Sequence, residues 1–334
     1  MKRKNIKHWG LFITLQLITL SLFAQGPNNT GTYYQSANGL KGKALKTAMF
    51  KIIRNHSQLS YDGLWTAFRT TDMREDGKVW DMYSDKTNYV FGSSAQGANY
   101  RKEGDSYNRE HSFPKSWFND AKPMYTDLVH LVPTDGYVNN RRSNYPFGEN
   151  NGEKYKSNKG FSKLGKCTYP GYSGIVFEPN DLYKGDFARI YFYMATAYED
   201  KIANWSGSEF PKIASHDSYK PYKDWQMNML IEWAKKDPVC QKEIDRNRGI
   251  QQQQNNRNPF VDYPGLEEYI WGSMQNVAFS YDNYQGVSSI PFIEFETEPI
   301  YPKGWYNLNG QKVGDECPTQ KGIYIHHGKK MVIE

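Results

Sequence analysis

Residues 108–149 read NREHSFPKSWFNDAKPMYTDLVHLVPTDGYVNNRRSNYPFGE, and this stretch concentrates acidic, basic, amide and aromatic side chains. Its part VPTDGYVNNRRSN predicts a loop that runs into a short helix, with Thr134 or Asp135 as the residue that caps the helix. Glu110 and His111 are adjacent and precede that helix. The stretch therefore combines a carboxylate, an imidazole and a helix rich in amides and arginines.

Hydrolysis of a phosphodiester bond needs these types of side chain. Mg2+ takes oxygen ligands, usually one or two from the protein, and offsets the charge that builds on the leaving oxygen. Glu110 and Asn139 offer such oxygens, and His111 has the unperturbed pKa, about 6.5, that suits a general base. Neighbouring side chains of an extended segment point to opposite faces. We therefore expect a bent, irregular loop at Glu110 and His111, which Pro114 nearby favours.

Four sequence blocks resemble the endonuclease I family of secreted bacterial nucleases: NREHSFPKSW, DLVHLVPTDGYVNNRRSNYPFGE, FEPNDLYKGDFARIYFYMATAY and EIDRNRGIQQQQNNRNPFVD. They occur in order between about residues 34 and 271. The family belongs to the His-Me finger (ββα-metal) nucleases. The resemblance therefore implies an α+β fold, with that motif as the core of a largely helical domain. It also implies metal ligands at Glu110 and Asn139, a general base at His111, and Mg2+ as the cation, with Mn2+ or Ca2+ as alternatives.

Two arginines are expected at the substrate phosphate. Arg142 follows Asn139 by three positions, so a helix places the two on neighbouring faces. Arg142 could bind a phosphate through two hydrogen bonds, or form a salt bridge that holds the motif together. By resemblance Arg189 reaches toward the phosphate; the alternative is a buried ion pair, for which Asp186 is a partner three residues away. Three further arginines could line a nucleic-acid groove: Arg246, Arg248 and Arg257.

The two ends of the chain differ from its middle. Residues 1–24 join the basic KRKNIK to the apolar LFITLQLITLSLF, which predicts a signal peptide cleaved near Ala24; the apolar run is too short for a comfortable membrane span. Residues 25–280 are expected to form the nuclease domain. Residues 281–334 predict a linker and a β-rich tail with turns at Asn-Gly and His-Gly, and they resemble the sorting tails of exported bacterial proteins.

Apolar periodicity predicts helices in residues 39–56, 60–72, 177–200, 224–239 and 264–273. Trp80, Met82 and Tyr83 are expected to begin a strand that enters the core. Asp81 lies between them, and we expect a structural role for it rather than metal binding.

Charge and cysteine content add weaker constraints. The net charge of +6 falls to +2 without the four basic residues of the leader, which is compatible with a phosphate-binding groove but does not identify one. The three cysteines, Cys167, Cys240 and Cys317, do not have metal-binding spacing. A Cys167–Cys240 disulfide and free thiols both remain open.

Together with the resemblance, these features predict a secreted, monomeric, metal-dependent endonuclease without sequence specificity. The resemblance implies that it cleaves DNA, with RNA as a further substrate, and leaves 5′-phosphate ends. Two alternatives remain: an extracellular ribonuclease of the same fold, and an exported surface-binding protein without catalysis. A zinc hydrolase is disfavoured, because no His/Cys set has zinc-binding spacing.

Overall fold

The structure is a computed structural model that describes residues 26–85, 88–286, 304–307, 311–314, 318, 320–326 and 329–333. They fall into two compact units, within residues 1–287 and 288–334, which are described separately. The expected signal peptide, residues 1–24, lies outside the described residues. The first unit extends past residue 280, where we expected the nuclease domain to end, because Phe279 and Tyr281 are buried in it.

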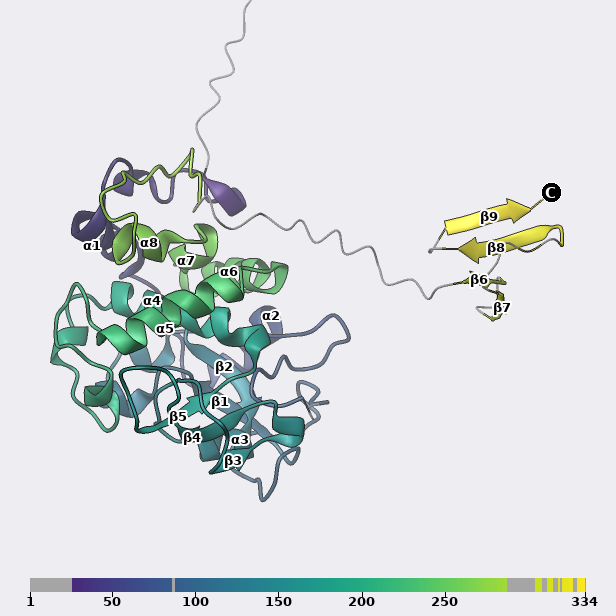
Figure 1. The fold of residues 1–334 in the computed structure, drawn as a ribbon, viewed down its shortest axis with the longest axis horizontal. Coiled ribbons are helices and arrows are strands. Elements are labelled where there is room, and N and C mark those ends of the chain that lie inside the picture. Colours follow the sequence, from purple (N-terminus) through teal and green to yellow (C-terminus); the bar gives the residue numbers. More distant parts are fainter. Residues whose placement is uncertain are drawn as a thin grey trace, which may run out of the picture. The chain divides into compact units, whose positions relative to one another are not determined.

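The first unit is mixed helix and sheet, as the α+β prediction requires. Its helices, within the described residues, are α1 (Gly42–Ile53), α2 (Gly63–Thr71), α3 (Gly136–Arg142), α4 (Lys184–Ala197), α5 (Asp224–Lys236), α6 (Gln241–Gln254), α7 (Pro259–Asp262) and α8 (Leu266–Ile270). Figure 1 shows α1 and α4 to α8 gathered on one side of the unit, with α3 and the strands on the other. The helices expected from apolar periodicity are confirmed.

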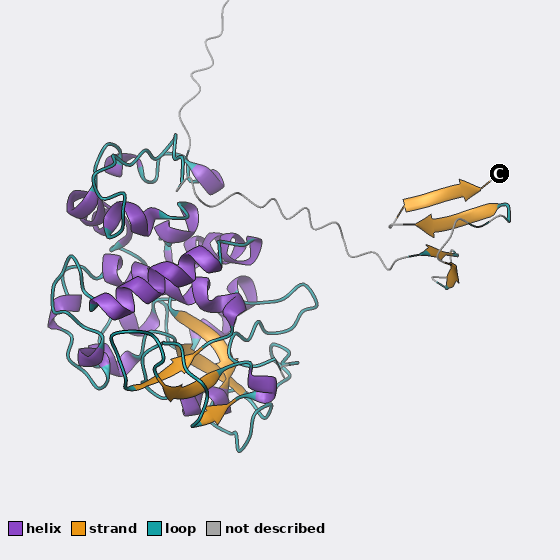
Figure 2. Cartoon of the chain, in the orientation of Figure 1, coloured by secondary structure: helices purple, strands orange, loops and turns teal. Residues whose placement is uncertain are grey.

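The strands of this unit form two small antiparallel sheets, drawn in orange in Figure 2. Their bounds are β1 (Tyr107–His111), β2 (Leu131–Asp135), β3 (Tyr155–Lys156), β4 (Lys163–Lys166) and β5 (Ile175–Glu178). Strand β1 pairs with β2, and Glu110 lies opposite Val132 and His111 opposite Leu131. The other sheet has the order β3-β4-β5.

Helix α4 lies at the centre of the core. Every residue from Gly185 to Ala197 is buried, because the helix carries aromatic and aliphatic side chains on all its faces. It packs against α5 and α1. A polar or charged side chain on such a buried helix needs a partner within the protein, and this requirement applies to Arg189.

Two local predictions are wrong. Glu110 and His111 lie in strand β1 rather than in an irregular loop, because the pairing with β2 continues to His111, the last residue of the strand. Their side chains therefore leave β1 on opposite faces, and a site that uses both residues has to lie at the end of this strand. Met82 and Tyr83 do not begin a strand: only isolated bridges, Met73 to Val79 and Lys78 to Val90, occur in that region. Tyr83 is nevertheless fully buried, as expected of a core residue.

The second unit is β-rich, as predicted. Its described strands are β6 (Trp305–Tyr306), β7 (Lys312–Gly314), β8 (Gly322–His326) and β9 (Lys329–Ile333), in the order β7-β6-β8-β9. Cys167 and Cys240 are free thiols, so the disulfide between them is not present; Cys317 lies outside the described residues.

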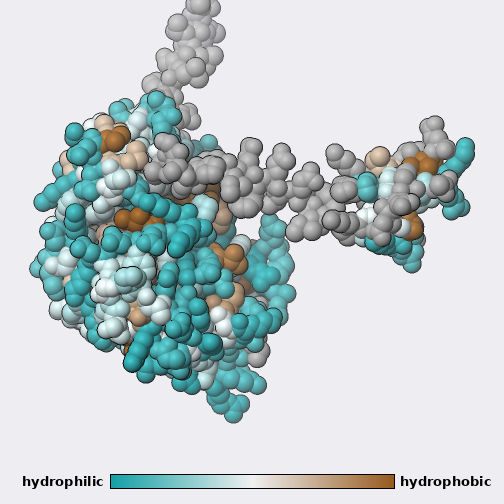
Figure 3. Space-filling view, in the orientation of Figure 1, coloured by the Kyte–Doolittle hydropathy of each residue, from teal (hydrophilic) through white to brown (hydrophobic). Residues whose placement is uncertain are grey.

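The face of the first unit visible in Figure 3 is mainly hydrophilic, with scattered apolar residues. Within the part of the chain that the structure describes, no helix combines the length and apolar character needed to cross a membrane.

Candidate active site

The hairpin β1–β2 runs directly into helix α3, which brings the residues of the central stretch together. Asp135 caps α3: its Oδ1 accepts a hydrogen bond from Val138 N at 2.9 Å. The Asp135 backbone N–H in turn donates to Asp81 Oδ2 at 2.8 Å, and Asp81 Oδ1 accepts from Tyr83 N at 2.7 Å. The predicted cap and the structural role of Asp81 are therefore both confirmed.

Glu110 is a buried carboxylate with only 4% of its surface exposed. Its Oε1 accepts hydrogen bonds from Tyr83 Oη at 2.8 Å and from Arg142 Nη1 at 2.7 Å. Burial raises the pKa of Glu110 to about 7, although the charge of Arg142 and hydrogen bonds from Tyr83 and Asn139 act in the opposite direction. One arginine therefore does not fully compensate for the desolvation of this carboxylate, and a further cation beside it would be stabilising.

Asn139 lies on α3, and a residue of β1 orients its side chain. Its Nδ2 donates to Asn108 Oδ1 at 2.8 Å, and its side chain also bonds Glu110. An amide that uses its nitrogen in this way presents its oxygen, Oδ1, as an acceptor. The structure therefore places the Glu110 carboxylate and the Asn139 amide together, as predicted for these two residues.

His111 ends β1 on a different set of contacts. Its Nε2 lies 3.0 Å from the Tyr125 carbonyl oxygen, which makes Nε2 the protonated nitrogen and leaves a lone pair on Nδ1. Among the described residues no hydrogen bond to Nδ1 is formed, so the protein leaves its lone pair unused. Burial and, secondly, the charge of His130 lower the pKa of His111 well below its usual value. The imidazole is thus neutral at physiological pH and able to accept a proton.

His130 packs behind His111. The two ring centroids lie 5.5 Å apart, and His130 is fully buried with Nε2 2.7 Å from the Met124 carbonyl oxygen. His130 therefore both packs against the His111 ring and forms a hydrogen bond with the protein backbone.

The donors at Glu110 and Asn139 fit a hard divalent cation. One is an incompletely neutralised carboxylate and the other a neutral amide oxygen, which are the ligand types that Mg2+ prefers, with water completing its shell. Among the described residues, no cluster of three or more His, Cys, Asp or Glu side chains is arranged to hold a metal ion.

Arg142 lies behind Glu110 instead of at a substrate phosphate. Only 1% of its surface is exposed. Besides Glu110, it donates from Nη1 to the His111 carbonyl at 3.0 Å and from Nη2 to the Ser112 carbonyl at 2.6 Å. The structure therefore shows the salt bridge that holds the motif together, and Arg142 is a positioning residue that ties both Glu110 and His111 to α3.

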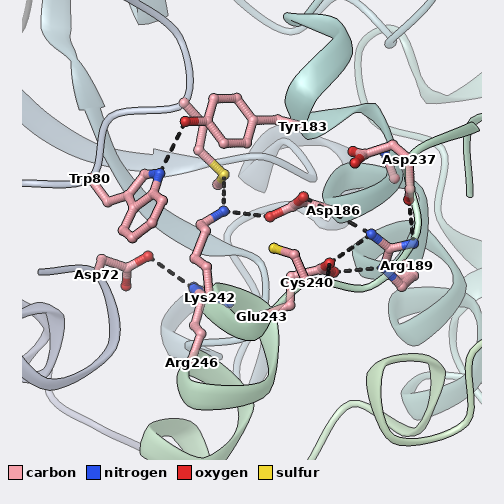
Figure 4. Close-up of polar contacts among 12 residues, drawn as sticks. Asp72, Trp80, Tyr183, Asp186, Arg189, Asp237, Cys240, Lys242, Glu243 and Arg246 are labelled. Atoms are coloured by element: carbon pink, nitrogen blue, oxygen red, sulfur yellow. Dashed lines mark hydrogen bonds and ion pairs between the residues drawn. The ribbon is translucent and has the colours of Figure 1, made fainter. Parts of the chain in front are cut away.

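Arg189 is also enclosed in the protein, which corrects the expectation that it reaches toward phosphate. Its guanidinium donates to both oxygens of Glu243, at 2.6 and 2.7 Å, and to the Asp237 carbonyl at 2.9 Å (Figure 4). Asp186 is not its main partner, since the two groups are 4.0 Å apart and Asp186 binds Lys242. Arg189 therefore joins α4 to α6 in a buried ion pair.

The three further arginines do not form a basic groove. Arg246 is buried and binds Asp72 at 2.9 Å as well as three backbone carbonyls, and Arg257 is buried against Asp262. Arg248 is exposed and pairs with Asp245 at 2.8 Å. The sequence identifies these arginines as basic, but only the fold shows that each is paired with an aspartate of the same chain.

Tyr83 and Asn108 are site residues that the sequence did not single out for this role. Tyr83 Oη binds Glu110, and Asn108 Oδ1 orients Asn139. Asn108 offered a signal, because it lies two residues before Glu110 on the same strand and its side chain points to the same face. Tyr83 offered none, because 27 residues separate it from its partner.

A model of the Endonuclease I family matches residues 41–265, and the chain belongs to that family. It is therefore an endonuclease. Among curated proteins, it is 38% identical to an extracellular ribonuclease of Bacillus amyloliquefaciens over 254 residues, which are 73% of this chain and 79% of that protein. It is 36% identical to an extracellular ribonuclease of Bacillus subtilis (strain 168), over 77% of this chain and 84% of that protein. A periplasmic deoxyribonuclease of Aeromonas hydrophila is 29% identical over 42% of this chain and 48% of its own length.

Proposed function

We propose that this protein is a secreted, metal-dependent endonuclease in which β1, β2 and α3 form a ββα-metal motif. Glu110 and Asn139 hold the cation, for which Mg2+ is the first candidate, and His111 is the general base. The observation that carries the proposal is the geometry of His111: its Nε2 is fixed by the Tyr125 carbonyl, and the lone pair of its Nδ1 has no hydrogen-bond partner among the described residues.

The side chains divide the work as follows. Nδ1 of His111 removes a proton from the attacking water, which the lowered pKa permits because the imidazole starts neutral. Arg142 and Tyr83 hold the Glu110 carboxylate in place, and Asn108 holds the Asn139 amide. When bound, the cation stabilises the charge on the phosphate and on the leaving 3′ oxygen. A single chain supplies all of these side chains.

RNA is the substrate we favour, with DNA as the second candidate. The two relatives at 36–38% identity are named ribonucleases and align over most of their length, whereas the deoxyribonucleases align over a shorter part at lower identity. The proposed catalytic groups act on the phosphodiester and not on the edges of the bases, so we propose cleavage without sequence specificity. We also propose products with 5′-phosphate ends. We also propose that the protein is exported, because these relatives are named extracellular or periplasmic. The leader would be removed near Ala24.

The test is cleavage by the purified mature protein of a single-stranded RNA and of supercoiled plasmid DNA, each with Mg2+ and with EDTA. We expect Mg2+-dependent internal cuts, with RNA cut faster than DNA, and 5′-phosphate ends that a phosphatase removes. Cleavage that persists in EDTA would refute the metal assignment. Absence of cleavage of both polymers with Mg2+, Mn2+ and Ca2+ would refute the proposed function.

A further inference from the structure

Four aromatic rings surround the His111 imidazole, and two of them reach the surface. Phe118 and His130 are buried, whereas Tyr61 and Tyr125 are half-buried. The Tyr61 ring is nearly parallel to the imidazole, at 6.2 Å between centroids and 20° between planes. The Tyr125 ring lies 5.3 Å from the imidazole and 4.9 Å from Tyr61. These two tyrosines, called the tyrosine pair below, are thus the surface-reaching rings of the cluster around the proposed base.

The tyrosine pair is anchored to strand β1. Arg109, two residues before His111, donates from Nη1 to the Tyr61 carbonyl at 2.6 Å, and its guanidinium lies 3.5 Å from the centre of the Tyr61 ring. The Trp65 ring, 4.5 Å from the same guanidinium, supports it further. Tyr125 is tied to β1 by the hydrogen bond between its carbonyl and His111. The Tyr61 ring and the Tyr125 backbone are therefore held beside the imidazole.

A lysine that is paired with an aspartate lies beside the rings. Lys115 Nζ lies 5.5 Å from the centre of the Tyr125 ring, and 45% of the Lys115 side chain is exposed. Asp120, at 2.8 Å, is its partner, so the lysine is held close to the ring. Aromatic rings together with cations are the combination with which proteins bind single-stranded nucleic acid, because bases stack on the rings and cations hold the backbone.

We propose that the tyrosine pair is a subsite for an unpaired nucleobase of the nucleotide next to the scissile phosphate. This inference rests on the proposed function, in which His111 Nδ1 activates the water that attacks that phosphate. A phosphate within reach of His111 carries a nucleoside directly attached to it, and the tyrosine pair is the aromatic surface beside the imidazole. Bases of a duplex are stacked and paired inside the helix, whereas an unpaired base can present its face to a ring.

The consequence is a preference for single strands that comes from the subsite and not from the catalytic groups. Loss of the tyrosine pair is expected to raise KM for single-stranded substrate on the order of tenfold, which is typical of one lost stacking contact. Cleavage of duplex substrate should change much less, because its bases do not reach the rings. The ratio of the two rates is a readout that a general loss of folding would not move.

The direct test uses a single-stranded oligonucleotide of uniform sequence with one abasic residue, made of whichever sugar the wild type cleaves. Every other bond in the same strand is the internal standard. We expect the wild-type protein to avoid one bond adjacent to the abasic residue, and Tyr61→Leu/Tyr125→Leu to cut that bond as often as the others. Tyr61→Phe/Tyr125→Phe keeps the rings and should keep the avoidance. Tyr172→Leu is the matched control, because it removes a ring that stacks on Trp225, 4.6 Å away. This variant should still avoid the bond next to the abasic residue.

Two outcomes would overturn the subsite: wild-type cleavage next to the abasic residue at the same rate as elsewhere, or avoidance that survives in the double Leu variant. The first outcome is measured on the wild-type protein alone. It can therefore refute the subsite even if the variants fold poorly. Failure of the proposed function would look different, because the wild type would then cleave no bond in any substrate.

Discussion

Arg142 Nη1 lies 2.7 Å from Glu110 Oε1, and both side chains are buried. This ion pair joins helix α3 to strand β1 at the point where the proposed cation would bind. The same nitrogen also donates to the His111 carbonyl. The geometry of the carboxylate and the position of the base therefore depend on one guanidinium.

Replacement of Arg142 should consequently destabilise the fold as well as the site. Arg142→Ala leaves Glu110 buried without its partner, and removing one member of a buried pair typically costs about 3–5 kcal/mol. Arg248→Ala is the matched control, because its pair with Asp245 is exposed and should contribute less than about 1 kcal/mol. The measurement is the free energy of unfolding in urea; similar small losses for both variants would refute this role of Arg142.

Arg189 should be important for stability and dispensable for chemistry. We expect Arg189→Ala to lower the free energy of unfolding by about 3–5 kcal/mol. Arg189→Met/Glu243→Met removes both charges and should recover much of that loss, while kcat per folded molecule stays within about threefold of wild type. A large fall in kcat in a folded double variant would show that Arg189 contacts the substrate after all.

Features that depend on contacts between residues close in sequence were predictable, and features that depend on distant contacts were not. The start of α3 was predictable because Asp135 caps it through a contact three residues away. The proximity of Glu110 and Asn139 was predictable because one stretch of sequence contains both residues. The burial of the arginines was not predictable. Arg142 and Arg189 were expected at the phosphate and Arg246 in a nucleic-acid groove, although each is already paired within the protein. The regular strand at Glu110 was missed because β2, which pairs with it, lies some twenty residues further along the chain.

Glu110 should make the metal-free protein less stable as pH rises. Its folded-state pKa, about 7, lies above the ordinary glutamate value of 4.5, so the folded state holds the proton more tightly. The stabilisation is therefore present below pH 4.5 and is lost between pH 4.5 and about 7, by roughly 3 kcal/mol in total. The pKa values of Asp237 and Glu267 are also raised to about 7, so the informative quantity is the difference between wild type and Glu110→Gln.

The free energy of unfolding is measured for both proteins in EDTA from pH 4.5 to 8. As pH rises, the wild type should lose stability relative to Glu110→Gln. A difference independent of pH would contradict the assignment of this titration to Glu110.

Mg2+ should stabilise the folded protein, and more strongly at pH 8 than at pH 5.5, because the ion binds the ionised form of Glu110. We expect Tm to rise with Mg2+ in the wild type and in Asn139→Asp, which keeps a side-chain oxygen, but not in Asn139→Leu. The readout is thermal unfolding, which does not depend on catalysis. An equal rise of Tm in Asn139→Leu would place the ion elsewhere.

The most direct test of the central claim is the rate of RNA and DNA cleavage in saturating Mg2+ by His111→Ala, compared with wild type and with His216→Ala. His216 is exposed, with its Nδ1 on the Ala203 carbonyl, and is the matched control. The account predicts that His111→Ala loses about 10²–10⁴-fold in kcat and remains folded, while His216→Ala retains the wild-type rate. A folded His111→Ala protein that cleaves either polymer at the wild-type rate would contradict the assignment of His111 as the general base.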